Sequence, residues 1–229
     1  MMYQLHSPRG VPAVLRAREG TSDLAVIGST FRGVAGSGLI DEYGLRETYI
    51  SGRFVDVGAH IGSVSIAVLL DNPDATALLV EPLPENIEEI TTNLAANGLL
   101  DRADILAGAV GTDTIHYGFE GTEVARTNRY IGNLAMPMKV TKTAVVRLVT
   151  LSDLLPAAAM KLDCEGGEWA LLTDPRIVEI PLIFGEYHGS PGAAGVTKAL
   201  GRTHRVMFQD RTLSTGNFRA ERQIEGVAA

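Results

Sequence analysis

The feature that most constrains the fold is a short apolar stretch that leads directly into a turn containing two glycines. Residues 54–57 read Phe-Val-Asp-Val, and the chain continues as Gly58-Ala59-His60-Ile61-Gly62. A stretch of this length is typical of a buried strand, and glycine permits a tight turn between a strand and a helix. This order predicts the start of a doubly wound α/β sheet, in which a nucleotide-like ligand lies against the helix N-terminus at the first turn.

Apolar segments alternate with helical segments from Arg53 onward, which predicts repeated βαβ units and a mostly parallel sheet. We expect strands at residues 54–57, 75–80, 103–110, 160–163 and 182–184, and helices at about 61–70, 84–97, 168–173 and 193–200. Residues 205–209 and 218–224 predict a terminal hairpin that adds one antiparallel member. The expected architecture is therefore a Rossmann-like, doubly wound sheet of seven strands.

No repeat or linker divides the 229 residues, so we expect a single domain over residues 1–229. Residues 1–50 are rich in glycine at their C-terminal end and are expected to form an N-terminal cap over the sheet edge or the mouth of the site. Residues 111–158 are too long for a simple crossover and predict an insertion before the fourth strand, with some strand of its own. The insertion is a candidate substrate region because it gathers polar side chains, namely Arg126, Asn128, Arg129, Tyr130 and Asn133.

The composition limits the kinds of partner and the compartment that we expect for this protein. The formal net charge of −7 disfavours nucleic acid, whose phosphates usually require a basic surface. The apolar stretches are too short to span a membrane, and the first twenty residues lack the apolar core of a secretory signal. The lone cysteine, Cys164, agrees with a reducing compartment. We expect a cytoplasmic protein that acts on a small molecule, with no nucleic-acid or membrane partner.

Two acidic residues distinguish between the ligands that such a fold binds. Glu81 follows the second strand, nineteen residues after Gly62, close to the spacing at which a carboxylate binds a ribose hydroxyl pair. Ala59 and His60 replace the middle glycine that a dinucleotide requires, and Asp56 would attract an ammonium group and repel a phosphate. These features favour S-adenosylmethionine, which has an ammonium and no phosphate. A nicotinamide-dependent oxidoreductase is the more distant alternative.

The chain resembles the FkbM-type methyltransferases between about Thr21 and His188. The resemblance rests on short matches in one order: residues 54–62 and 80–82 with Asn86, residues 109–111 and 150–155, residues 161–168, and Glu186-Tyr187-His188. Thr21-Ser22-Asp23 is also similar to the family's N-terminal segment. The sequence departs from the family at His60, where an asparagine is expected, and at Cys164 and Gly167, which replace valine and alanine.

The resemblance implies a class I methyltransferase fold, S-adenosylmethionine as methyl donor and, most often, O-methylation of a sugar, natural product or other small molecule. It also implies a donor site in which Asp56, Gly58 and Gly62 hold the methionine part and Glu81 holds the ribose. The residues expected to bind the donor are Asp56, Gly58, Ala59, His60, Gly62, Glu81, Pro82, Ala109 and Val110, of which Ala109 and Val110 would flank the adenine.

Four residues at the ends of the fourth and fifth strands are the catalytic candidates: Asp163, Glu165, Glu186 and His188. Methyl transfer to an oxygen requires an aligned acceptor and a group that takes its proton. His188 is the natural general base near neutral pH. A structural hydrogen bond is the alternative for His188, and capping of the next helix is the alternative for Glu165 and Glu168.

Three further alternatives concern the reaction itself. Asp163 and Glu186 supply oxygen ligands that suit Mg²⁺, although a metal is not favoured. N-methylation of an amino sugar or peptide amide stays open beside O-methylation. A binding protein without catalysis is disfavoured by the intact acids at Asp163, Glu165 and Glu186. Cys164 and Trp169 are expected to serve packing.

Overall fold

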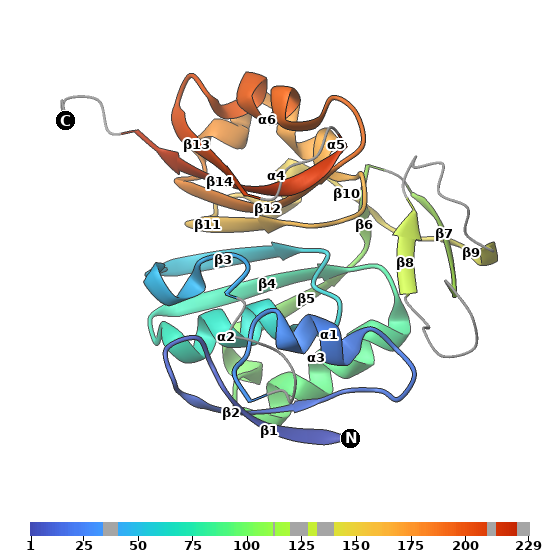
Figure 1. The fold of residues 1–229 in the computed structure, drawn as a ribbon. Coiled ribbons are helices and arrows are strands. Elements are labelled where there is room, and N and C mark those ends of the chain that lie inside the picture. The colour runs from blue at the N-terminus through green and yellow to red at the C-terminus, as the bar shows by residue number, and fades with distance from the viewer. Residues whose placement is uncertain (34–40, 112, 120–127, 132–139, 210–213, 224–229) are drawn as a thin grey trace.

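A seven-stranded sheet forms the centre of the protein. The computed structural model describes residues 1–33, 41–111, 113–119, 128–131, 140–209 and 214–223 (Figure 1). The sheet has the order β13-β14-β12-β11-β3-β4-β5. Its strands are β3 (Gly52–Val57), β4 (Ala75–Glu81), β5 (Ala103–Ala107), β11 (Ala159–Leu162), β12 (Leu182–His188), β13 (His204–Gln209) and β14 (Thr215–Arg222).

The direction of the strands confirms the predicted class. β3, β4, β5, β11 and β12 pair in parallel, whereas β14 runs antiparallel to both β12 and β13. The first strand of this sheet along the chain, β3, lies in its middle. The chain continues through β4 and β5 to one edge, and then returns to the other side of β3 to form the rest of the sheet. This reversal between β3 and β11 is the switch point at which doubly wound folds bind their ligands. The sheet has the order and the single antiparallel strand of a class I methyltransferase.

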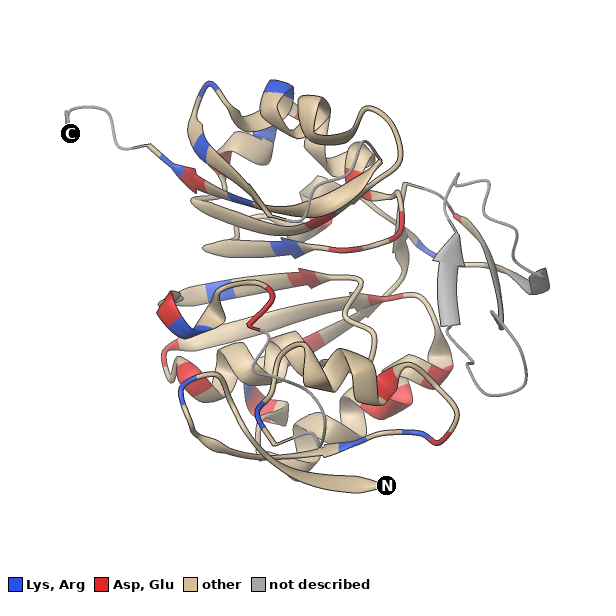
Figure 2. Cartoon of the chain, viewed as in Figure 1, with Lys and Arg blue, Asp and Glu red and all other residues tan. Residues whose placement is uncertain are grey.

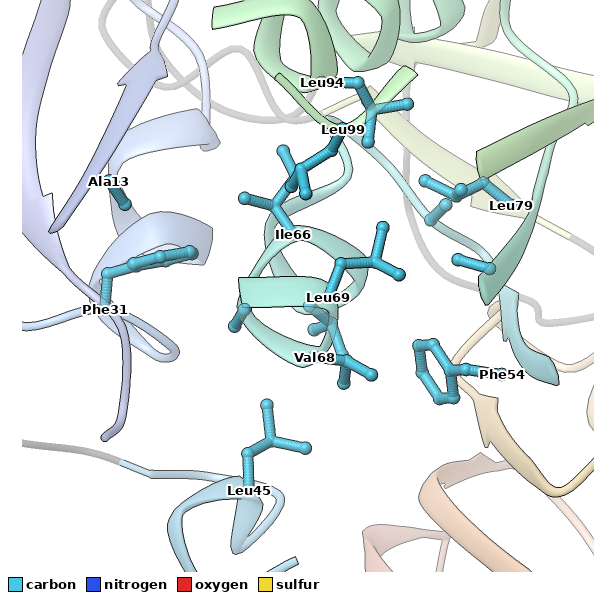
Figure 3. Close-up of a cluster of buried hydrophobic side chains, with 14 of the residues drawn as sticks. Ala13, Phe31, Leu45, Phe54, Ile66, Val68, Leu69, Leu79, Leu94 and Leu99 are labelled. Carbon is cyan, nitrogen blue, oxygen red and sulfur yellow. The ribbon is translucent and has the colours of Figure 1, made fainter. Parts of the chain in front are cut away.

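Helices cover both faces of the sheet because the strands are apolar on both faces. On one face α2 (Ser63–Asp71) and α3 (Pro84–Ala96) pack against Phe54 and Leu79 (Figure 3). Phe184 belongs to the same hydrophobic core. On the other face α4 (Leu151–Leu154), α5 (Glu168–Leu172) and α6 (Gly192–Leu200) pack against Val55 and Met160. Side chains alternate along a strand, so Phe54 and Val55 supply opposite cores.

The N-terminal region is more regular than the sequence suggested. β1 (Met2–His6) and β2 (Pro12–Arg16) form an antiparallel hairpin, followed by α1 (Asp23–Gly28). The hairpin lies on α3, where Asn93 and Asn97 accept hydrogen bonds from the backbone N–H groups of Arg16 and Val14 at 2.6 and 2.9 Å. Because these contacts are made to a helix about eighty residues away, no local sequence pattern announces them.

The predicted insertion contains strands of its own. β6 (Ala109–Val110) pairs with β10 (Leu148–Val149), and β7 (Thr114–Phe119), β8 (Asn128–Ile131) and β9 (Val140–Val145) form a separate antiparallel sheet. Figure 1 shows this small sheet beside the main one. Among the polar residues predicted to meet a substrate, Arg126 and Asn133 lie outside the described residues, and the side chains of Asn128, Arg129 and Tyr130 are likewise not described.

Several predicted boundaries differ from the structure, and three of the differences have a clear physical reason. α2 begins at Ser63 because Gly62, with a φ of 83°, precedes its first turn. The predicted strand 103–110 divides at Gly108, where a Cβ atom would lie 2.7 Å from the carbonyl oxygen of Arg147. β12 continues to His188 instead of ending at Phe184, because β14 pairs with its whole length.

Within the described part of the chain, no helix is long and apolar enough to cross a membrane. Figure 2 shows lysine and arginine residues on several separate elements of the fold.

Candidate active site

A cavity of about 360 Å³ opens at the carboxyl ends of the central strands. Its walls come from the turns after β3 and β4, from β6, from the chain after β11, from β12, and from the N-terminal segment with α1. The predicted residues that line it are Gly58, Ala59, His60, Glu81, Pro82, Ala109, Val110, Asp163, Glu165 and Glu186. The cavity therefore lies at the switch point that the fold predicts.

The turn after β3 depends on glycine at position 58. Gly58 has a φ of 78°, and a Cβ atom there would collide with the backbone carbonyl of Asp163. His60 also adopts a left-handed conformation, with a φ of 53°, which is uncommon for a residue with a side chain. This turn brings the end of β3 against the end of β11, so residues 58–60 and the acidic residues share one cavity.

Glu81 is held at the cavity wall by three donors. Its carboxylate accepts hydrogen bonds from the backbone N–H groups of His60 at 2.9 Å and Leu83 at 3.0 Å, and from the side chain of Asn86 at 3.1 Å. Burial raises the pKa of Glu81 to about 7, against the effect of these hydrogen bonds. The carboxylate is thereby fixed in place where a ribose would lie.

Asp56 occupies a different position from the one predicted. It is fully buried and does not line the cavity; one oxygen accepts a hydrogen bond from Ser65 at 2.7 Å, and the other lies 3.4 Å from Nζ of Lys161. Lys161 and Asp56 are register partners on neighbouring strands, so their side chains leave the sheet on the same face. Asp56 therefore pairs with Lys161, and a direct contact with a donor ammonium does not fit this placement. Gly62 is also outside the cavity wall, at the start of α2.

The N-terminal segment contacts the turn after β3 through an ion pair. Arg18 binds Asp23 at 2.8 Å and also donates to the side chain of Asn86 at 2.8 Å, and Asp23 lies 3.6 Å from Nε2 of His60. Burial lowers the pKa of His60 to about 4, so this ring is neutral at physiological pH. Four residues of this segment and of α1 line the cavity: Ser22, Ala25, Val26 and Ser29.

An unpaired hydroxyl in the wall fits a polar ligand. The Oγ atom of Ser63 is buried at the start of α2 and has no hydrogen-bond partner among the described residues. A buried polar atom without a partner costs about 1–3 kcal/mol, which a bound polar ligand would relieve. Together with the fixed carboxylate of Glu81, this hydroxyl suits the ribose and amino-acid groups of S-adenosylmethionine.

The acidic end of the cavity is organised around Asp163. Its Oδ2 accepts a hydrogen bond from the hydroxyl of Tyr43 at 3.1 Å and lies 3.5 Å from Nζ of Lys161. Burial would raise the pKa of Asp163, but the charges of Lys161 and His188 outweigh it and lower the pKa. Asp163 is therefore ionised and oriented by a cation and a phenol.

His188 does not have the properties predicted for a general base. It is buried behind the cavity wall, with Nδ1 2.7 Å from Glu168, and with Nε2 3.2 Å from Glu186 and 3.8 Å from Glu165. Burial opposes protonation, yet hydrogen bonds with Glu168 and Glu186 raise the pKa of His188 to about 11. The ring is a cation at neutral pH, so it has no free lone pair with which to take a proton.

Glu168 is fully buried at the start of α5. It accepts hydrogen bonds from the backbone N–H groups of Cys164 and Gly166 at 3.2 and 2.8 Å, in addition to its contact with His188. Cys164 is a buried free thiol whose pKa is raised by burial, in agreement with a packing role. Trp169 is partly buried and donates from Nε1 to the backbone of His188 at 2.7 Å.

Asp163, Glu186 and His188 form a group whose ligand atoms lie within 4.8 Å of one another. Such a group has the residue types of a divalent-cation site. In this structure, however, Asp163 is bound by Tyr43 and Lys161, and Glu186 and His188 face each other. Each residue of the group thus already has a partner within the protein.

Several residues of the cavity wall were not predicted from the sequence. Glu42, Tyr43, Ser63, Leu83, Gly108 and Lys161 line it, in addition to Asn86. A lysine inside the apolar strand 160–163 is itself a signal, because a buried lysine requires an acidic partner. Glu42 and Tyr43 gave no such signal, since they lie in a glycine-rich segment more than one hundred residues from their partners.

The fold and this cavity define a class I methyltransferase. The FkbM methyltransferase domain matches residues 56–212, which is more than half of the chain. The chain belongs to the FkbM methyltransferase family, and it is an S-adenosylmethionine-dependent methyltransferase.

Several solved structures are similar to this chain at low sequence identity. The C-terminal domain of precorrin-6Y C5,15-methyltransferase from Rhodobacter capsulatus is 15% identical, with a TM-score of 0.47 over 76% of this chain and 82% of that one. An O-methyltransferase family protein from Burkholderia thailandensis is 9% identical, with a TM-score of 0.47 over 88% of this chain and 55% of that one. A tRNA methyltransferase from B. subtilis is 11% identical, with a TM-score of 0.44 over 75% of this chain and 60% of that one. No curated protein matches the chain.

Proposed function

We propose that this enzyme is an O-methyltransferase that transfers the methyl group of S-adenosylmethionine to a hydroxyl of a small molecule, such as a sugar or a natural product. The observation that carries the proposal is the position of Asp163, Glu165 and Glu186 in the same cavity as Glu81. Carboxylates at the reacting end can orient a hydroxyl for methyl transfer. The cavity volume of about 360 Å³ suits a donor and a small acceptor.

The donor is proposed to lie along the turn after β3. Glu81 would accept hydrogen bonds from the ribose hydroxyls, and Ala109 and Val110 would flank the adenine. Gly58, Ala59, His60 and Ser63 would surround the methionine part. In this arrangement Asp56 acts through Lys161, which it holds beneath the loop, where Nζ donates to the carbonyl oxygen of Gly58 at 2.7 Å.

N-methylation is the second candidate, and the charge of the cavity favours it. Glu42, Asp163, Glu165 and Glu186 all line the wall, whereas Lys161 is the sole lysine or arginine among the described lining residues. Such a wall attracts an amine and repels a carboxylate or phosphate. An amino sugar is a possible acceptor for either reaction, since it carries both hydroxyls and an amine.

Two measurements test the proposal. Isothermal titration calorimetry with S-adenosylhomocysteine is expected to show binding in the micromolar range, and the absence of heat would contradict a donor site in this cavity. Transfer of labelled methyl groups to a panel of matched neutral sugars, amino sugars and sugar phosphates then separates the candidates. Transfer to neutral sugars supports O-methylation, transfer restricted to amino sugars supports N-methylation, and a preference for sugar phosphates contradicts both.

The single-domain organisation of residues 1–229, with residues 1–50 as a cap and residues 111–158 as the substrate region, is part of the proposal. Glu42 and Tyr43 of the first segment and Ala109 and Val110 beside the second line the same cavity, which supports it. The cytoplasmic location and the role in natural-product biosynthesis stay predictions of the sequence.

A further inference from the structure

Glu42 lies where the donor cavity meets a second, smaller pocket. This residue precedes the matched family domain, which begins at residue 56. The second pocket, of about 120 Å³, is lined by Glu42 and Tyr43 together with Met207, Asn217 and Arg219 of β13 and β14. Because Glu42 and Tyr43 belong to the walls of both spaces, they form the boundary that an acceptor entering from the smaller pocket would cross.

The other carboxylates at the acidic end of the cavity, Asp163, Glu165 and Glu186, each face a protein cation. Asp163 lies 3.5 Å from Nζ of Lys161, and its Oδ2 also accepts the hydroxyl of Tyr43. Glu186 and Glu165 lie 3.2 and 3.8 Å from Nε2 of the protonated His188. A carboxylate that faces a cation is stabilised in its charged form and is a weak proton acceptor.

Glu42 has neutral partners instead. The side-chain amide of Asn217 donates to its Oε1 at 3.3 Å, and its backbone N–H donates to the carbonyl of Ser29 at 3.4 Å. No ion pair with a lysine, arginine or histidine involves Glu42 in the part of the chain that is described. The charged groups that face it are Glu186 and Asp163, so burial and like charge together raise the pKa of Glu42.

We propose that Glu42 faces the methyl-transfer position and is the base that takes the proton of the acceptor. The inference rests on the proposed function and deepens it. A bond forms between the acceptor's oxygen or nitrogen and the methyl carbon, while the bond from that carbon to sulfur breaks. The sulfur keeps the electron pair and leaves as S-adenosylhomocysteine, and the acceptor's proton moves to Glu42. Tyr43 and Asn217 act as positioning residues, the first for Asp163 and the second for Glu42.

Sinefungin tests the position of Glu42 without knowledge of the acceptor. This analogue carries a protonated amine where S-adenosylmethionine carries its methyl group, and S-adenosylhomocysteine carries nothing there. The ratio of their two dissociation constants, measured by calorimetry on the full chain, therefore reports contacts at the methyl-transfer position alone. Contacts to the ribose and adenine are the same for both ligands and cancel in the ratio.

We expect the wild-type chain to prefer sinefungin and Glu42→Gln to lose about tenfold of that preference, as for a lost charged hydrogen bond. Affinity for S-adenosylhomocysteine should change less than about twofold, which also shows that the variant is folded. Glu42→Asp, which keeps the charge, should retain part of the preference. Glu47→Gln removes the same charge from an exposed position of the same segment and should leave the ratio unchanged.

The pH dependence tests the proton. The preference of the wild-type chain for sinefungin should rise with increasing pH as Glu42 ionises, and the rise should be centred above pH 4.5, because burial and the charges of Glu186 and Asp163 raise the pKa of Glu42 above its ordinary value. This rise should be absent in Glu42→Gln.

An unchanged ratio in Glu42→Gln, an equal loss in Glu47→Gln, or the same rise with pH in Glu42→Gln would each overturn the inference. Failure of the wild-type chain to bind S-adenosylhomocysteine would instead contradict the proposed function, so the two failures are distinguishable.

Discussion

The hydroxyl of Tyr43 donates a hydrogen bond to Oδ2 of Asp163 across 3.1 Å, which joins the N-terminal segment to the end of β11. Tyr43 is buried, and its ring lies 5.7 Å from that of Phe184. The pKa of Tyr43 is raised by burial and by the charge of Asp163, so the phenol keeps its proton and acts as a donor. The segment before the family domain is thus bound to the acidic end of the cavity.

Removing this hydroxyl tests that connection. Tyr43→Phe keeps the ring and is expected to lower the free energy of unfolding by about 1 kcal/mol, the usual contribution of a buried hydrogen bond. Tyr49→Phe is the matched control, because Tyr49 donates to Asp74 at 2.9 Å but is 61% exposed. Urea denaturation should show almost no change for the control. Equal effects in both variants would contradict a structural role for the Tyr43 contact.

Glu81→Ala tests the ribose contact. The variant loses a charged acceptor and is expected to bind S-adenosylhomocysteine about 1–3 kcal/mol more weakly, or about 5- to 150-fold. Glu88→Ala removes an exposed acid on the helix that follows and should bind like the wild-type chain. Calorimetry checks both variants, and unchanged affinity in Glu81→Ala would place the ribose elsewhere.

The architecture could be predicted because its signals are local. The apolar runs and the glycine turn at 58–62 indicate strand, turn and helix within a few residues. Pro84 lies in the first turn of α3, where the missing N–H of proline is tolerated. Gly98 follows the end of this helix with a φ of 66°, a conformation that glycine adopts readily. The residues at the carboxyl ends of β4 and β11 reach the cavity because parallel strands end at one edge.

What could not be predicted depends on contacts between distant segments. Asp56 was expected in the donor site, but the register of β3 with β11 sets Lys161 beside it, and the sequence does not contain that register. His188 was expected as a base, but Glu165 and Glu168 near the start of α5, together with Glu186 of its own strand, surround it and keep it protonated. Glu42 and Tyr43 were missed because only the folded chain brings residues 42–43 to residues 163 and 186.

Gly58 and Gly98 offer a comparison of two left-handed glycines. Both have positive φ, which costs an L-residue about 1–2 kcal/mol. At Gly58 a Cβ atom would also collide with the carbonyl of Asp163, whereas nothing lies within 4 Å of a Cβ atom at Gly98. Gly58→Ala is therefore expected to lower the free energy of unfolding by about 3 kcal/mol or more, and Gly98→Ala by about 1 kcal/mol. Similar losses in denaturation experiments would contradict the close approach of β3 to β11.

The pair of His188 and Glu168 gives a pH-dependent contribution to stability. The pKa of His188 rises from 6.5 to about 11 on folding, so the folded state binds the proton more tightly than the unfolded chain. The contribution is fully present below about pH 6.5, where both states are protonated. It declines as pH rises, because the unfolded chain loses its proton first, and it is lost as pH passes through about 11.

Two variants measure this contribution. His188→Gln leaves the buried carboxylate of Glu168 without its cation and is expected to lose about 3–5 kcal/mol of stability near neutral pH. The double variant His188→Gln/Glu168→Gln leaves no buried charge from the pair, so its difference from the wild-type chain isolates the pair's own pH dependence. Thermal denaturation should show that difference to be largest near pH 6 and to shrink towards pH 9. The raised pKa of Glu81 contributes equally to the stability of the wild-type chain and of the double variant, so it cancels in their difference. A difference that stays constant or grows over this range would mean that His188 is neutral in the folded protein, and would restore it as a candidate base.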